Sequence, residues 1–65
     1  MIYTVKSQTA VRFGEVTVMC DTEGLDLAEA VFSRTVQAAN YGERVTLTRR
    51  VDHLDTEETL RTRSM

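Results

Sequence analysis

Residues 26–42, DLAEAVFSRTVQAANYG, decide the fold because they carry the clearest helical pattern in the chain. Asp26 stands at a suitable N-cap position, and Glu29 follows three residues later, as in a capping box. Gly42 suits the left-handed conformation that ends many helices. These signals predict a helix over residues 27–41, capped by Asp26 and stopped at Gly42.

The predicted helix has an unusually wide apolar face. At 100° per residue, its apolar side chains fill about half of the circumference, whereas an ordinary surface helix needs a stripe of only about 100°. A single small sheet would leave part of this face in water. We therefore expect the small-residue flank near Ala28 and Ala39 to admit a partner. The apolar face comprises Leu27, Ala38, Val31, Ala28, Ala39, Phe32 and Val36.

Two strands joined by a turn are predicted before the helix. Residues 2–8 are rich in the β-branched and aromatic side chains typical of strands. The next run alternates, which predicts that Val16, Val18 and Cys20 share one face. Gly14 supplies the positive φ that a tight turn between the two runs requires. A hairpin is the natural interpretation.

A third strand is predicted over residues 44–51, with Val45, Leu47 and Val51 facing inward and the threonines facing outward. The chain as a whole, residues 1–65, is then a single small α+β domain. We expect two layers: an antiparallel sheet of three or four strands, with one helix on one face, in the order strand–strand–helix–strand.

The tail, residues 52–65, leaves three conformations open. Asp55 and Glu58 have the spacing of a capping pair for a short helix. Residues 59–63 alternate and fit a fourth strand that folds back behind a turn at residues 54–57. A frayed tail is the third alternative.

Composition excludes several classes of protein. The 65 residues are 42% apolar and 28% charged, which is typical of a soluble globular domain. A net charge of −2 gives no general attraction to nucleic acid or to an anionic membrane. The sequence shows neither the ~18-residue apolar run of a membrane span nor a signal peptide. One cysteine is consistent with a reducing compartment, so we expect a cytoplasmic protein with no membrane association.

Small size favours a partner. Below ~70–80 residues one core rarely supplies more than ~3–5 kcal/mol, and natural chains of this size often add disulfides, a metal or a second subunit. A single cysteine excludes an internal disulfide. His53 and Cys20 are too few soft ligands for a zinc site. Oligomerisation is the remaining means of stabilisation.

We predict no catalytic, cofactor-binding or metal-binding residue. His53 is the only histidine and is expected to be a solvated loop residue. The acidic residues within 52–58 lack the glycine and the oxygen ladder of a calcium loop. Cys20 is expected to be a small buried hydrophobe. No nucleophile-elbow, phosphate-loop or zinc motif is present, so the chain is not expected to be an enzyme.

Basic residues are concentrated late in the chain. Residues 1–43 carry three cations and six anions, net −3, whereas residues 44–65 carry five cations and four anions, net +1. If the tail pairs with the third strand, four guanidinium groups come together and suit phosphate or carboxylate binding. Internal pairing with acidic residues 52–58 is the interpretation we favour. The four are Arg49, Arg50, Arg61 and Arg63.

A helix–glycine–strand pattern covers residues 32–50, which are 19 of the 65 residues. It consists of Phe32, Val36, Ala39, Gly42-Glu43, Val45 and Leu47-Thr48-Arg49-Arg50. The pattern resembles the corresponding segment of the Phd/YefM antitoxin family. That resemblance implies a dimeric DNA-binding domain whose C-terminal extension wraps a toxin.

We therefore predict a small non-enzymatic protein-interaction module of the bacterial or phage type, acting as a homodimer or as an accessory, modulatory subunit. The alternative is an antitoxin-like regulator that places its Arg-rich third strand and tail on nucleic acid. A pI near 5.2 and few aromatic residues make this alternative less favoured. The expected interaction surface comprises Ala28, Phe32, Val36, Ala39, Arg49, Arg50, Arg61 and Arg63.

Overall fold

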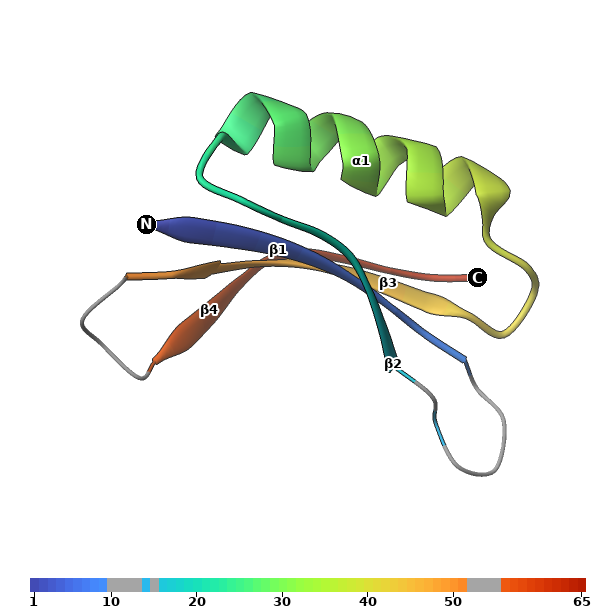
Figure 1. Ribbon diagram of the computed structural model, residues 1–65. Coiled ribbons are helices and arrows are strands. Elements are labelled where there is room, and N and C mark those ends of the chain that lie inside the picture. Colours follow the sequence, from blue (N-terminus) through green and yellow to red (C-terminus); the bar gives the residue numbers. More distant parts are fainter. Residues whose placement is uncertain (10–13, 15, 52–55) are drawn as a thin grey trace.

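Four strands and one helix build the fold in the computed structural model, which describes residues 1–9, 14, 16–51 and 56–65. Figure 1 shows the strands as one sheet with the helix on one face. All pairings between neighbours are antiparallel. The predicted two-layer α+β fold is thereby confirmed. The elements are β1 (Ile2–Gln8), β2 (Val16–Thr22), α1 (Leu25–Ala38), β3 (Arg44–Arg50) and β4 (Glu57–Ser64).

The sheet has the order β2-β1-β3-β4, so β1 and β3 are central while β2 and β4 are the edges. The predicted hairpin of β1 and β2 is confirmed, and Gly14 between them has the expected positive φ of 54°. Of the three conformations left open for the tail, the strand is found, because β4 pairs with β3 along its length. The tail is therefore neither a short helix nor frayed over residues 57–64. Of the turn predicted at residues 54–57, residues 54 and 55 lie outside the described residues, and Glu57 already belongs to β4.

The helix starts earlier than predicted, and Asp26 is not its N-cap. Gly24 occupies the N-cap position, and its carbonyl accepts the first helical hydrogen bond from the Ala28 amide at 3.0 Å. The hydroxyl of Thr22 accepts a hydrogen bond from the Gly24 amide at 3.2 Å. Asp26 lies in the first turn, where its charge favours the positive end of the helix dipole.

The end of the helix was also predicted too late. The helical conformation stops at Ala38, and Ala39 is extended, with φ −71° and ψ 142°. Gly42 belongs instead to the following turn, where its φ of 93° is the positive value that a type II turn requires at the third position. The Glu43 amide closes this turn on the Asn40 carbonyl at 3.1 Å.

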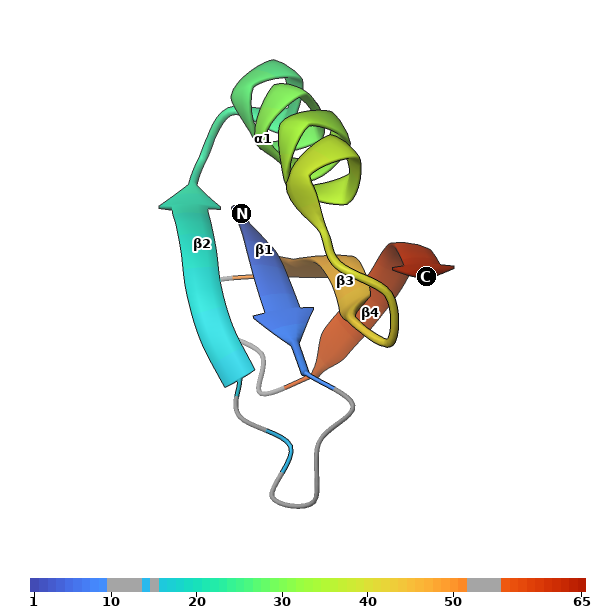
Figure 2. The ribbon, with the colours of Figure 1, turned by 90° about the vertical axis from the view of Figure 1, so that its right-hand side faces the viewer.

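A small core lies between α1 and the sheet. The helix packs on β1, β2 and β3, and Figure 2 shows it above β1 with β4 to one side. The predicted inward positions Val45 and Leu47 are fully buried. The fully buried hydrophobic residues are Val5, Ala28, Val45 and Leu47, and the half-buried residues packed on them are Tyr3, Cys20, Val31, Phe32, Val36, Ala39 and Leu60.

A β-bulge overturns the predicted common face in β2. Cys20 pairs with Val5, but the next partner of β1, Lys6, pairs with Val18, so the register shifts between them. Cross-strand partners share a face, so Cys20 faces the helix and Val18 faces away. The sequence predicted one common face for Val18 and Cys20 because the alternation rule assumes a strand without a bulge.

Candidate functional site

Four of the eight predicted interaction residues lie on or next to α1, and they differ in accessibility. Ala28 is 0% exposed against the sheet, so it is not available to another molecule. Phe32, Val36 and Ala39 are half-buried and pack against the core. The helix flank near Ala28 and Ala39, which was predicted to contact a partner, is therefore partly buried inside the chain.

The other four predicted residues are arginines, and the strand register divides them between two faces. Arg61 pairs with the buried Leu47, and Arg63 follows two residues later, so both lie on the helix side of the sheet. Arg49 shares that side because it stands two residues from Leu47 on β3. Arg50 faces away from the helix. The four guanidinium groups therefore do not form one cluster.

Two of these arginines pair with carboxylates, whereas Arg50 and Arg63 have no ion pair with another described residue. Arg49 donates to Glu58 across the β3–β4 pair. Arg61 Nη2 lies 3.3 Å from Glu29 Oε1 on the helix. Both pairs are well exposed, so each contributes only about 0–1 kcal/mol. The Arg63 side chain has no hydrogen bond or ion pair with any other described residue.

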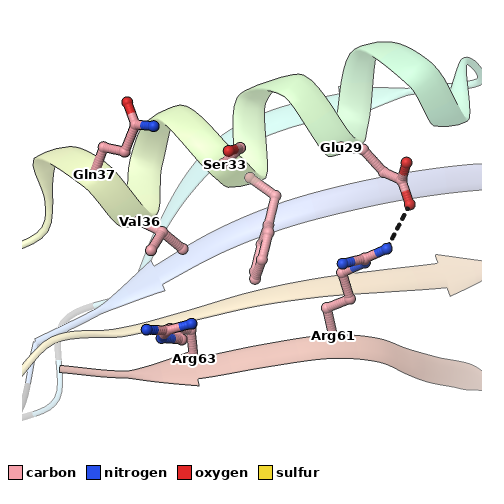
Figure 3. Close-up of a pocket in the computed structure, with 7 residues that line it drawn as sticks. Glu29, Ser33, Val36, Gln37, Arg61 and Arg63 are labelled. Carbon is pink, nitrogen blue, oxygen red and sulfur yellow. Dashed lines mark hydrogen bonds and ion pairs between the residues drawn. The ribbon is translucent and has the colours of Figure 1, made fainter.

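A groove of about 340 Å³ separates α1 from β4. Figure 3 shows Gln37, Ser33 and Glu29 along the helix, with Arg61 and Arg63 on the strand across from them. The groove forms because α1 packs on β1, β2 and β3, while β4 continues the sheet beyond the helix. Its lining residues are Glu29, Phe32, Ser33, Val36, Gln37, Arg61 and Arg63.

The groove joins four residues that the sequence singled out with three that it missed. Phe32 and Val36 were predicted from the apolar face of the helix, and the two arginines from the charge of the tail. Glu29, Ser33 and Gln37 lie on the helix outside the predicted apolar face, and the sequence did not single them out as interaction residues. Only the position of β4 beside the helix makes these three polar residues part of a site.

The edge strand β2 carries the second candidate surface. Three of the seven exposed large hydrophobic side chains among the described residues lie on it: Val16 (54% exposed), Val18 (57%) and Met19 (49%). Asp21 is the only charged residue of the strand. The sequence expected both valines to face the core, so it missed this surface, and the β-bulge is the cause.

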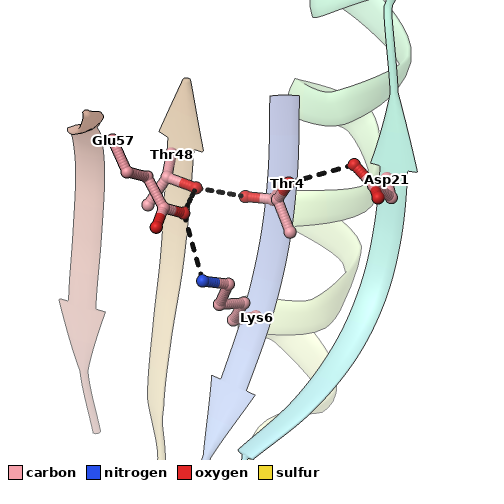
Figure 4. Close-up of polar contacts among 5 residues, drawn as sticks. All are labelled: Thr4, Lys6, Asp21, Thr48 and Glu57. Atoms are coloured by element: carbon pink, nitrogen blue, oxygen red, sulfur yellow. Dashed lines mark hydrogen bonds and ion pairs between the residues drawn. The ribbon is translucent and has the colours of Figure 1, made fainter. Parts of the chain in front are cut away.

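A polar cluster covers the face of the sheet opposite the helix (Figure 4). Glu57 on β4 accepts a hydrogen bond from the Thr48 hydroxyl, and its Oε1 lies 3.1 Å from Lys6 Nζ. These two contacts, the Thr48 hydroxyl first, lower the pKa of Glu57 below its ordinary value. Thr4 and Asp21 add a hydrogen bond of 3.1 Å between β1 and β2. The interactions of this cluster tie strands together.

The free cysteine and the candidate metal ligands can be placed only in part. Cys20 is a free, half-buried thiol packed against the core. Within the ranges that the structure describes, no three His, Cys, Asp or Glu side chains gather closely enough to hold a metal ion. His53 lies outside the described residues, as do Asp52 and Asp55. The helix of the described chain is not long and apolar enough to cross a membrane.

The antitoxin resemblance covers the second half of α1 and all of β3, and in this structure that segment follows a hairpin of two strands. The resemblance stays a prediction carried by residues 32–50. Comparison of the chain with protein-family models, with curated proteins and with solved structures gives no match.

Proposed function

We propose that this chain is a non-enzymatic protein-interaction module that forms a homodimer along β2. The observation that carries the proposal is the exposure of Val16, Val18 and Met19 on an edge strand. An edge strand also presents unpaired backbone groups that accept another strand. Apolar side chains and open backbone groups on the same strand favour pairing with a second copy.

The two edges of the sheet differ in a way that favours a closed dimer over a filament. β2 has one charged residue, Asp21, whereas β4 has four: Glu57, Glu58, Arg61 and Arg63. Charged side chains on an edge oppose unspecific strand pairing. Two copies of β2 related by a two-fold axis present the same surface to each other, which is the commonest geometry of homodimers.

The small core favours dimerisation because the single chain has few buried apolar contacts. Among the described residues, four hydrophobic side chains are fully buried, and no disulfide supports them. A core in a chain of this length rarely supplies more than ~3–5 kcal/mol. Burial of the β2 valines between two copies would add apolar contacts that the single chain lacks.

Light scattering at micromolar concentration tests the proposal. The expected mass is twice the 7.4 kDa of the chain, with a melting temperature that rises with concentration. Val18→Lys places a charge on the edge and should give a single-chain mass. Thr59→Lys is the matched control, because Thr59 is an exposed residue of the other edge strand, and this variant should remain dimeric.

A single-chain mass for the unmodified protein, with a melting temperature independent of concentration, would contradict the homodimer. The chain would then have to act through a different protein. The nucleic-acid alternative has weaker support, since the arginines lie on both faces of the sheet. Phosphate binding would appear as an affinity that falls steeply with salt.

A further inference from the structure

We propose that the groove between α1 and β4 binds an extended acidic peptide segment, which adds as a strand along the edge of β4. Acidic and apolar side chains of the segment would enter the groove on the helix side. This surface lies at the opposite edge of the sheet from β2. Either proposed interaction can therefore fail without the other.

The backbone of β4 provides the first reason. As an edge strand it has one side without a partner in the sheet, and seven of its eight residues are exposed. Peptides recognise such edges by strand addition, in which main-chain hydrogen bonds supply affinity and alternate side chains supply specificity. Neighbours across a strand pair share a face, so alternate side chains of the added strand would stand beside Arg61 and Arg63.

The charge of the groove provides the second reason. Arg63 lines the groove, and its guanidinium group has no hydrogen bond or ion pair with the rest of the described chain. Among the described residues, the Arg61 guanidinium pairs only with Glu29, in an exposed contact of 3.3 Å that an incoming carboxylate can replace. Guanidinium groups bind carboxylates through two parallel hydrogen bonds. The groove is thus locally cationic in a chain whose net charge is −2.

The groove also has an apolar component, which selects among anions. Phe32 and Val36 line it and remain half-buried. Ser33 and Gln37 are exposed polar residues of the same lining and can hydrogen-bond to a ligand. The matching segment carries glutamate or aspartate and an aliphatic residue at alternate positions, so that all of them face the helix.

A designed peptide tests this pattern directly. The probe is a fluorescein-labelled Thr-Glu-Thr-Val-Thr-Glu-Thr peptide, and the control replaces both glutamates by glutamine. Fluorescence polarisation against the full chain measures both affinities. We expect the glutamate peptide to bind about tenfold more tightly than the glutamine peptide, and the difference to shrink as salt is raised. Amide shifts in an NMR titration should be largest in β4.

Three charge variants separate the groove from a general attraction. Arg63→Gln should weaken binding of the glutamate peptide about fivefold. Glu29→Gln should strengthen it about twofold, because this substitution releases Arg61. Arg34→Gln removes the same charge from an exposed helix residue that is not part of the groove lining, and should change the affinity less than about twofold.

Gln37→Glu adds a carboxylate at an exposed position of the lining and should weaken binding without disturbing the core. Equal affinity for the two peptides would overturn the proposal. So would an Arg34→Gln effect as large as that of Arg63→Gln, or weaker binding in Glu29→Gln. The Val18→Lys variant should bind the peptide unchanged, which distinguishes this site from the β2 interface.

Discussion

The ammonium nitrogen of Lys6 on β1 lies 3.1 Å from Oε1 of Glu57 on β4, so this ion pair crosses over β3. Thr48, on the intervening strand, donates a hydrogen bond from its hydroxyl group to the same carboxylate. Three strands therefore meet at one side chain (Figure 4). Glu57 is the first residue of β4, so these contacts attach the start of that edge strand to the sheet.

Stability should fall in acid because of this carboxylate. A hydrogen bond from Thr48, and a smaller contribution from the hydrogen bond with Lys6, lower the pKa of Glu57 in the folded chain. A lowered folded-state pKa stabilises the protein above the ordinary pKa of glutamate, and the contribution is lost as the pH falls through the lowered value. Urea unfolding as a function of pH should show this loss in the unmodified chain and a smaller one in Glu57→Gln.

Thr48→Val tests the larger contribution to the lowered pKa of Glu57, which is the hydrogen bond from the Thr48 hydroxyl. Without the hydroxyl donor, the folded-state pKa of Glu57 should rise and the acid-induced loss of stability should begin at higher pH. An acid limb that is identical in Thr48→Val and in the unmodified chain would contradict the assigned role of the hydroxyl.

Enlarging Ala28 should destabilise the fold. Its methyl group is fully buried between α1 and the sheet, so Ala28→Leu must displace core side chains at a cost of about 1–3 kcal/mol. Ala30→Leu is the control on the exposed side of the same helix, and surface changes of this kind cost less than about 0.5 kcal/mol. Equal urea midpoints for the two variants would place Ala28 outside the core.

Removing the Thr22 hydroxyl should weaken the start of the helix. This hydroxyl accepts a hydrogen bond from the Gly24 amide at the N-cap, and a bond of that kind contributes about 0.5–1.5 kcal/mol. Thr22→Val should lower the free energy of unfolding by that amount. Thr17→Val, at an exposed position of the same strand, should not lower it. If Asp26→Ala lowers the free energy of unfolding more than Thr22→Val does, Asp26 is the N-cap, as the sequence predicted.

The features predicted correctly from the sequence depend on local patterns. The β-branched and aromatic composition of residues 2–8, the alternation of residues 44–51 and the apolar face of the helix each arise within one segment. Each of these elements was found close to its predicted position. The cap was missed because Gly24 occupies the N-cap position and its amide is bound by the Thr22 hydroxyl, a contact outside the capping-box pattern. β4 was left open because Leu60 is its only apolar residue, which gives a weak strand signal.

Features that depend on pairing between segments were not predictable. The shift between Cys20 and Val18 is a property of the β1–β2 pair, and it turns the two valines of β2 away from the core. The groove depends on where β4 pairs, since that register brings Arg61 and Arg63 opposite the flank of the helix with Ser33. The sequence identified Arg61 and Arg63 as candidate binding residues but did not show that both lie on the helix side of the sheet.

Hydrogen exchange of the β2 amides at low and high protein concentration tests the proposed dimer most directly. Pairing of two β2 strands should slow the exchange of the outward-pointing amides of residues 16–22 as concentration rises, while amides of residues 57–64 exchange at an unchanged rate. Val18→Lys should abolish the concentration dependence. Exchange in β2 that is independent of concentration, or protection that appears in β4 instead, would contradict a dimer joined along β2.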